Sequence, residues 1–189
     1  MSYLIRKTDT FLRNWKKNPD RYPLIIKGAR QVGKTETIRK FAKENYKNLV
    51  EINFITEPAY KTIIDEGFSA DNILKLISRI DPSKHFDAGE TLLFFDEIQD
   101  FPEIATSLKF FKENGKYDVI CSGSLLGVQY HRIASISVGY KTDYQMYSMD
   151  FEEFLWANGI GQTVIDSVKS CFESEKAVPD GIHKVMMEM

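Results

Sequence analysis

The sequence has little cysteine, little histidine and no excess of basic residues. Cys121 and Cys171 are its only cysteines, and they lie far apart, which excludes a disulfide framework and fits a reducing cytoplasm. The three histidines are too scattered to suggest a metal site. A formal net charge of −2 at pH 7 gives no global basic signature for nucleic acid, which stays open as a partner only through a local patch.

Long apolar runs are also missing. No run approaches the length of a membrane span, and the first residues lack the apolar core of a signal peptide. We therefore expect a cytoplasmic protein without a membrane partner. The 189 residues, 43% of them hydrophobic, are enough for a real core and suit one domain with an appendage.

The strongest local pattern is GARQVGKT, which fits the phosphate-loop pattern G-x-x-x-x-G-K-[ST]. Its residues are Gly28, Ala29, Arg30, Gln31, Val32, Gly33, Lys34 and Thr35. An apolar strand over residues 23–27 precedes it and a helical pattern follows, which is the context that the motif requires. The alternative is a glycine-rich turn that binds nothing.

Each part of this loop has a predicted role in binding a nucleotide. Gly28 and Gly33 are expected to adopt backbone angles closed to other residues and to let the main chain approach an anion. The loop N–H groups then cradle the α- and β-phosphates, and the positive end of the following helix points to the same place. Lys34 is predicted to reach the β- and γ-phosphates, and Thr35 to offer its hydroxyl to Mg²⁺.

A second pattern, LLFFDE at residues 92–97, combines a buried strand with two carboxylates at its carboxyl end. That end faces the ligand crevice in open α/β sheets. We expect Asp96 to hold Mg²⁺ with Thr35, and Glu97 to polarise the attacking water beside the γ-phosphate as a catalytic residue with Lys34. The alternative is an ordinary exposed strand end.

A third strand, predicted over residues 117–121, leads into Ser122-Gly123-Ser124. A small hydroxyl at this position can touch the γ-phosphate or the attacking water. Ser122 is therefore a catalytic candidate, at the place where one branch of P-loop ATPases has a residue called the sensor. The alternative is a simple turn.

The rest of the chain is predicted as helices and short strands. Residues 1–22 are predicted to form an amphipathic helix and a turn. One face of the helix carries Leu4, Thr8, Phe11, Leu12 and Trp15. Strands are expected over residues 48–54, 136–138 and 144–149, and a turn or short helix over 125–132. Further helices are predicted to begin with Asp71 as cap, with Pro102, and with an acidic capping box over residues 150–153.

Four segments resemble a known family of bacterial and archaeal AAA-type P-loop ATPases whose second half is a nuclease-like domain of unknown function. They are GARQVGKT, LLFFDEIQ at 92–99, CSGSLLG at 121–127 and YSMDFEEFLWA at 147–157. The resemblance covers this chain but only the ATPase half of the family architecture. It implies an α/β additional-strand parallel sheet, with the Cys121 strand between the loop strand and the Asp96 strand. It also implies the roles given above for Lys34, Thr35, Asp96, Glu97 and Ser122.

Two features depart from that family. An arginine often follows a glycine before the last strand, but here Gly139 is followed by Tyr140 and Lys141, which leaves Arg132 and Lys141 as weak candidates for an arginine finger. The ending resembles the start of a longer helical region. We therefore expect an ATPase core over residues 1–149 with the helix of residues 1–22 packed on it, and a truncated helical extension over 150–189.

Three functions are compatible with these patterns: a Mg²⁺-dependent ATPase that drives a partner module, a nucleotide-binding switch with little hydrolysis, and a small-molecule kinase. The carboxylate pair Asp96-Glu97 argues against the kinase, since a glutamate beside the γ-phosphate prepares water as the acceptor. Without an N-K-x-D motif, ATP is favoured over GTP. A homo-oligomer, a missing C-terminal domain and the cargo of the cycle stay open.

Overall fold

The computed structural model describes residues 3–124 and 139–187. It divides into two compact units, one over residues 11–148 and one that combines residues 1–10 with 149–189. The first unit contains a five-stranded sheet in which every described pair of neighbouring strands is parallel. Each unit is described by itself below.

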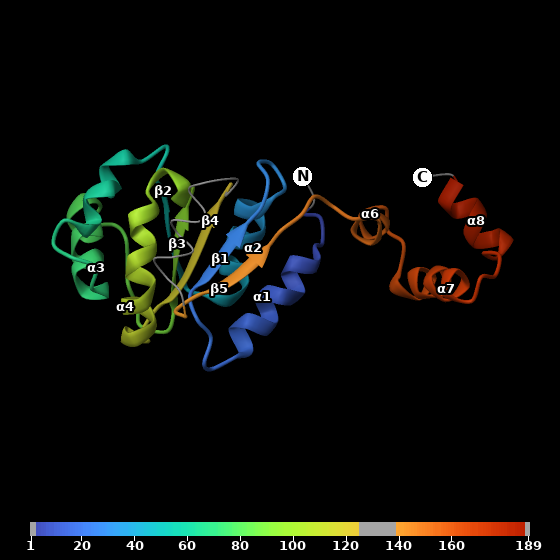
Figure 1. Cartoon of the computed structure of the whole chain (residues 1–189), viewed down its shortest axis with the longest axis horizontal. Helices are drawn as coiled ribbons and strands as arrows, with labels where there is room; N and C mark the ends of the chain where they lie inside the picture. The colour runs from blue at the N-terminus through green and yellow to red at the C-terminus, as the bar shows by residue number, and fades with distance from the viewer. Residues whose placement is uncertain (1–2, 125–138, 188–189) are drawn as a thin grey trace. The chain divides into compact units, whose positions relative to one another are not determined.

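The strand order of the sheet is β2-β3-β4-β1-β5 (Figure 1). The strands are β1 (Leu24–Lys27), β2 (Asn48–Asn53), β3 (Thr91–Asp96), β4 (Asp118–Gly123) and β5 (Thr142–Gln145). Strand β4, which carries Cys121, lies between the loop strand β1 and the Asp96 strand β3. The additional-strand α/β fold expected from the family resemblance is therefore confirmed.

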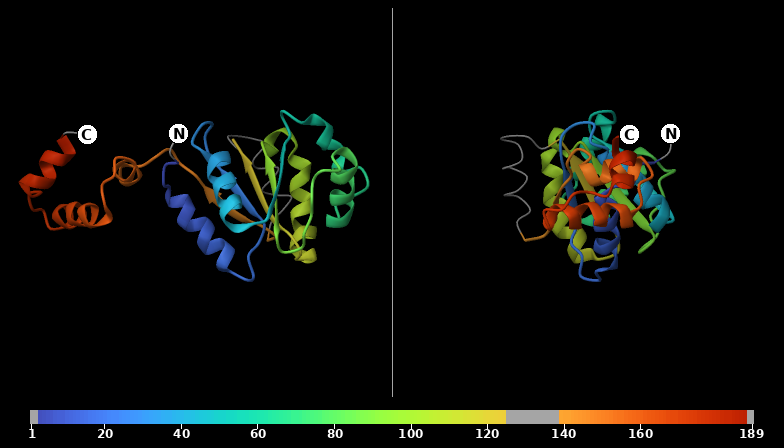
Figure 2. Two further views of the ribbon diagram at one scale, coloured as in Figure 1. Left: turned by 180° about the vertical axis from the view of Figure 1, so that it is seen from behind. Right: turned by 90° about the vertical axis from the view of Figure 1, so that its right-hand side faces the viewer.

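Helices cover both faces of this sheet, because alternate residues of the central strands point to opposite faces and both sets are apolar. On one face, Ile25, Leu93 and Phe95 pack against α3 (Ala70–Ile80) and α4 (Ser107–Asn114). On the other face, Ile26 and Phe94 share a core with residues of α1 (Lys7–Lys17) and α2 (Lys34–Asn45). Figures 1 and 2 show the sheet between these two helical layers.

Three expectations about helices were wrong in detail. Leu4 is 46% exposed, because α1 begins only at Lys7 and Leu4 precedes its buried face. The cap of α3 is Ser69, whose hydroxyl accepts the Asn72 N–H at 3.3 Å, so that Asp71 lies in the first turn instead. Pro102 opens the short 3₁₀ helix η3 (Pro102–Thr106), and α4 follows directly. Two further 3₁₀ helices are η1 (Pro58–Ile64) and η2 (Ile98–Asp100).

The last strand was also predicted too late in the chain. Strand β5 covers Thr142–Gln145, in register with Leu24–Lys27 of β1, and not residues 144–149. Because β1 ends at Lys27, the described ladder stops with the hydrogen bond from Met146 N to Lys27 O at 2.7 Å. The predicted strand over 136–138 and the turn over 125–132 lie outside the described residues.

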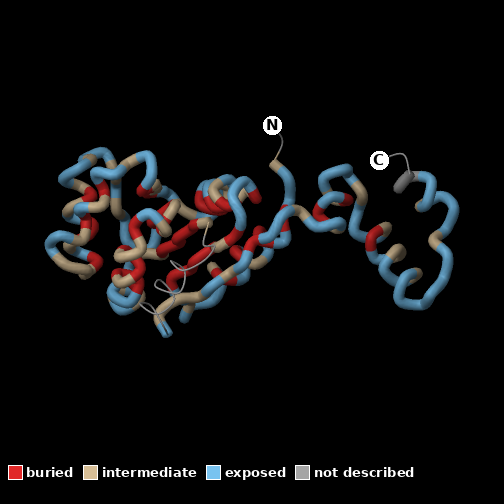
Figure 3. Tube along the Cα trace, turned by 45° about the horizontal axis from the view of Figure 1, so that its top comes forward, coloured by how far each residue is buried: buried red, intermediate tan, exposed pale blue. Residues whose placement is uncertain are grey.

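The second unit contains the start of α1 together with α6 (Phe151–Ala157), α7 (Gln162–Glu173) and α8 (Asp180–Met187). The predicted capping box is present, since Asp150 and Glu153 exchange side-chain to backbone hydrogen bonds. Glu153 also accepts the Lys7 N–H at 2.7 Å and pairs with Arg6 at 3.2 Å, so it joins the first residues to α6. Figure 3 shows few buried positions in this unit. The buried apolar residues among its described positions are Leu155 and Ile165.

Candidate active site

The predicted site residues lie at the carboxyl edge of the sheet, where β1, β2, β3 and β4 end. Parallel strands bring their carboxyl ends to the same edge, and the register sets Asn53 of β2 beside Asp96 of β3. Gly28, which opens the phosphate loop, follows the end of β1 at the same edge.

The loop of residues 28–35 connects β1 to α2. Gly33 precedes the helix in a left-handed conformation with φ of 96°, which glycine adopts at little cost. Gln31 has a positive φ of 63°, and Ala29, Arg30 and Gln31 are exposed. Gly33, the residue before α2, has no side chain that could cap the helix, so an acceptor for its first N–H groups has to come from elsewhere. An anion at this helix end would meet both these groups and the helix dipole.

Gly28 serves a purpose that differs from the predicted one. Its φ is not in the left-handed region, so the backbone angle does not require glycine. A Cβ atom at this position would lie 2.2 Å from the carbonyl oxygen of Met146, the residue after β5. Gly28 is therefore required by the close approach of the chain leaving β5.

Lys34 is 8% exposed and points back into its own loop. Its ammonium donates to the carbonyl oxygens of Gly28 at 2.9 Å and Ala29 at 2.7 Å. Desolvation lowers the pKa of Lys34, while the nearby charges of Glu97 and Asp96 act in the opposite direction. The Lys34 cation thus lies near the charges of two carboxylates.

Asp96 is the hub of the site and is 3% exposed. One carboxylate oxygen accepts the Thr35 hydroxyl at 3.0 Å and, more weakly, the Asn53 amide at 3.4 Å. The other accepts the Ser122 hydroxyl and the Glu97 N–H, the latter at 2.9 Å. The structure therefore brings together three predicted site residues, Thr35, Asp96 and Ser122.

Glu97 lies just beyond β3, in a left-handed conformation with φ of 56° and ψ of 44°. Such backbone angles are uncommon for residues other than glycine and cluster at functional sites. The Glu97 carboxylate accepts the side-chain N–H of Gln99, and the Gln99 oxygen accepts the Ser124 N–H at 3.1 Å.

Sequence reasoning missed Asn53 and Gln99. Asn53 could have been found as the polar residue that ends a strand next to the Asp96 strand. Gln99 lies within LLFFDEIQ, but an amide two residues after Glu97 carries no signal without the local backbone conformation. Asn53 is held by its own turn, since its side-chain oxygen accepts the N–H groups of Ile55 and Thr56.

The described residues do not include an arginine-finger candidate with a side chain that is free to reach another molecule. Arg132 lies outside them. The Lys141 side chain is 7% exposed and pairs with Asp143. In this conformation Lys141 is not positioned to reach another molecule.

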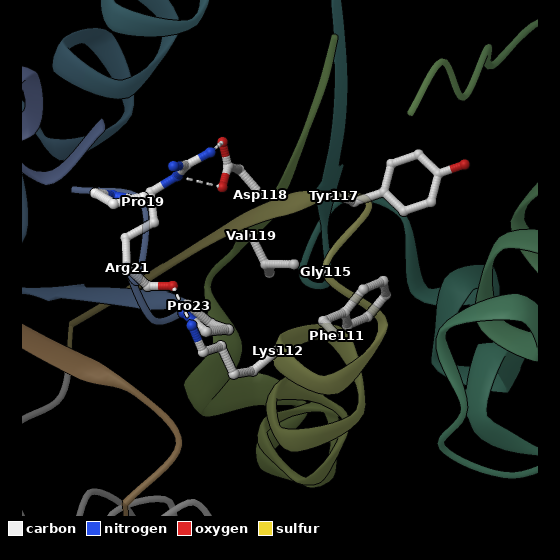
Figure 4. A pocket seen from close by; sticks show the side chains of 9 residues that line it. All are labelled: Pro19, Arg21, Pro23, Phe111, Lys112, Gly115, Tyr117, Asp118 and Val119. Atoms are coloured by element: carbon white, nitrogen blue, oxygen red, sulfur yellow. Dashed lines mark hydrogen bonds and ion pairs between the residues drawn. The ribbon is translucent and has the colours of Figure 1, made fainter. Parts of the chain in front are cut away.

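A cavity of about 70 Å³ lies where β1 and β4 begin, at the edge opposite to the phosphate loop (Figure 4). It is far smaller than ordinary ligand pockets of roughly 300 Å³ or more. Its cations have partners within the protein, because Arg21 binds Asp118 at 2.6 Å and Lys112 donates to the carbonyls of Asp20 and Arg21. This cavity is therefore a structural feature and not a second nucleotide site.

Asp118 holds this amino edge of the sheet together. Its carboxylate also binds Lys16 at 2.9 Å and the Tyr46 hydroxyl at 2.6 Å. Burial raises the pKa of Asp118, but the hydrogen bonds from Arg21, Tyr46 and Lys16 outweigh it and leave the pKa below its ordinary value. The carboxylate is thus stabilised in its charged form.

Comparison with known proteins identifies the family. Residues 20–155 match the family described as AAA domain, and because this match covers most of the chain, the chain belongs to this family of AAA-type P-loop ATPases. No curated protein matches the sequence. Among the described residues, none of the helices combines the length and the apolar character that a membrane span needs.

Solved structures share the fold at low sequence identity. A chain of Drosophila ORC bound to DNA aligns with a TM-score of 0.50 and 14% identity, over 88% of this chain and 48% of that one. Pif1 helicase from Candida albicans gives 0.49 and 14%, over 97% and 47%, and C. elegans PCH-2 gives 0.46 and 10%, over 75% and 42%. This chain therefore spans less than half of each of these proteins, and the likeness to the ORC chain supports the P-loop fold alone.

Proposed function

We propose that this chain binds Mg-ATP and hydrolyses it to ADP and phosphate. The observation that carries the proposal is the Asp96 hub, because it links a strand-end carboxylate to the loop threonine and to the hydroxyl that ends β4. A phosphate loop alone would support binding only. A buried carboxylate and a second acid beside that loop supply what hydrolysis requires.

The phosphates would bind at the loop N–H groups and the start of α2. Lys34 would exchange its two neutral carbonyl partners for the β- and γ-phosphate oxygens, since a charged acceptor is the stronger partner for an ammonium group. Gly28 lies so close to the Met146 carbonyl that only a glycine fits at this end of the loop.

The Thr35 hydroxyl and the Asp96 carboxylate fit a magnesium ion, since both are oxygen donors and lie 3.0 Å apart. These two residues would hold Mg²⁺, directly or through water. A bound Mg²⁺ neutralises charge on the β- and γ-phosphates.

Glu97 would accept a proton from the attacking water. The water oxygen forms a bond to the γ-phosphorus, the bond from that phosphorus to the bridging oxygen breaks, and ADP leaves with the electron pair. The Ser122 hydroxyl, fully buried and bonded to Asp96, would keep that carboxylate oriented during the reaction.

A nucleotide-binding switch with little hydrolysis is the second candidate, and the Lys141–Asp143 pair favours it. Loss of an arginine finger costs about 10³- to 10⁵-fold in rate. A partner module or a second copy of the chain would then have to supply the missing charge. The backbone after β5 would link the nucleotide site to such a module. It passes close to Gly28 at Met146 and continues into the capping box of α6.

A thermal melt with and without Mg-ATP, run beside a phosphate-release assay, tests the proposal. At a hundredfold excess over Kd the ligand adds about 2.7 kcal/mol, which raises Tm by about 5–10 °C in a chain of this size. Lys34→Ala should lose this shift. A shift with phosphate release supports the ATPase, a shift without release supports the switch, and no shift at saturating Mg-ATP refutes both.

A further inference from the structure

The side chain of Gln99 bridges two elements of the site. Its N–H donates to the Glu97 carboxylate, and its oxygen accepts the backbone N–H of Ser124, directly after β4. An amide is suited to this position, because one end donates and the other accepts. Gln99 therefore joins the acid that follows β3 to the backbone that follows β4.

The backbone beneath Gln99 is held firmly. Ile98 is fully buried and Phe101 is 8% exposed, both within the core on the α3 and α4 side of the sheet. Asp100 forms an ion pair with Lys61. Gln99 thus projects from the 3₁₀ helix η2, which is anchored on both sides of it.

Glu97 by contrast has few other restraints. It is half-buried, its backbone adopts the left-handed conformation, and Gln99 is the described residue that donates to its carboxylate. Without that donor the carboxylate would rotate among its staggered conformations. A general base must lie within hydrogen-bond reach of the proton that it accepts, so this freedom would slow the reaction.

We propose that Gln99 is the positioning residue of the general base, and that it aligns Glu97 with the end of β4. This inference rests on the proposed role of Glu97 in ATP hydrolysis. Gln99 therefore sets the direction of the base through its hydrogen bonds to the Glu97 carboxylate and the Ser124 N–H.

Two substitutions separate the two ends of the bridge. Gln99→Leu removes both hydrogen bonds at similar size. Gln99→Glu keeps an acceptor for the Ser124 N–H but cannot donate to Glu97 when ionised, and it sets two like charges side by side. Gln162→Leu is the matched control, because the described partners of Gln162 lie in the other unit and are Trp156, Glu152 and Asp166.

The experiment measures kcat, the Kd for Mg-ATP, and hydrogen exchange at the Ser124 amide in the nucleotide-free protein. For Gln99→Leu we expect kcat to fall about tenfold or more with Kd changed less than about twofold. The Ser124 amide should exchange faster. Gln99→Glu should lose kcat while Ser124 stays protected, and Gln162→Leu should match the wild type.

Glu97→Gln, measured in parallel, distinguishes the two proposals. If Glu97→Gln abolishes turnover while Gln99→Leu keeps the wild-type kcat and Ser124 exchange, the role of Gln99 is refuted and the ATPase proposal stands. Unchanged turnover in Glu97→Gln, or no turnover in the wild type, refutes the role of Glu97 and with it the role of Gln99.

Discussion

Replacement of Gly28 by alanine should destabilise the nucleotide-free protein through one contact. The added Cβ would lie 2.2 Å from the carbonyl oxygen of Met146, where real contacts stay above 3.0 Å, so that oxygen must move by about 0.8 Å. The contact atom belongs to the backbone and cannot rotate away as a side chain could. Because Gly28 has no left-handed φ, the substitution carries no separate penalty from backbone conformation.

The cost follows from what holds Met146 in place. Its N–H donates to Lys27 O at 2.7 Å, and its side chain is 1% exposed in the core with Leu24 and Ile26. Weakening that hydrogen bond costs about 1 kcal/mol, and overpacking costs about 1–3 kcal/mol. We therefore expect Gly28→Ala to lower the free energy of unfolding by about 2–4 kcal/mol.

Urea unfolding followed by tryptophan fluorescence measures this loss. The chain has two tryptophans, and a Trp156→Phe background leaves Trp15, which lies in the same core as Met146, as the reporter. Gly89→Ala is the control, because its φ of 78° costs about 1–2 kcal/mol while nothing among the described atoms lies within 4 Å of the new Cβ. If Gly28→Ala costs no more than Gly89→Ala, the contact with Met146 does not explain the glycine.

Two further predictions concern Asp118 and Glu153, acids that join separate segments of the chain. Asp118→Asn should cost about 2 kcal/mol, because Arg21 loses its charged partner. The pKa of Asp118 is lowered in the folded state, so the difference in free energy of unfolding between wild type and variant should be full above the ordinary pKa of 3.8. It should disappear as the pH falls through the lower folded-state pKa. Urea unfolding at several pH values measures this difference. Glu153→Ala should destabilise α6 by about 1.5–3 kcal/mol, since it removes half of the capping box and the acceptor of the Lys7 N–H. Glu152→Ala, which breaks more exposed ion pairs, should cost less than about 1 kcal/mol, and hydrogen exchange over residues 151–157 distinguishes the two.

The sheet could be predicted from the sequence because its central strands are apolar on both faces. Runs such as Leu92–Phe95 admit little but a strand covered by helices on both sides, and that is their position. The order of the strands was available only from the family resemblance, since periodicity does not say which strands are neighbours. The ends of β5 were missed because they depend on where β1 stops, at Lys27.

The site was predictable where strand topology determines it and unpredictable where local backbone conformation does. Asp96 and Ser122 lie near the carboxyl ends of buried strands, and Thr35 lies at the end of the phosphate loop, so the parallel topology brings them to one edge. The bridge by Gln99 depends on the left-handed conformation of Glu97 and the following 3₁₀ turn, which no residue pattern specifies. The reason for Gly28 depends on Met146, which is remote in sequence.

The connections of Asp96 determine how mutations at this site can be interpreted. Asp96→Ala would remove a proposed magnesium ligand, but it would also leave the fully buried Ser122 hydroxyl without its acceptor and release Thr35 and Asn53. An unsatisfied buried hydroxyl costs about 1–3 kcal/mol, so lost activity in this variant would not distinguish lost metal from a disturbed sheet edge. A pair of variants at Thr35 separates the loss of metal from the disturbance of the sheet edge. Thr35→Ser keeps the hydroxyl and removes only a methyl group. Thr35→Val removes the hydroxyl of this half-buried residue at nearly constant volume. If Thr35 holds Mg²⁺, activity should survive in Thr35→Ser, and Thr35→Val should require more Mg²⁺ for half-maximal activity while its Tm without nucleotide stays near that of the wild type.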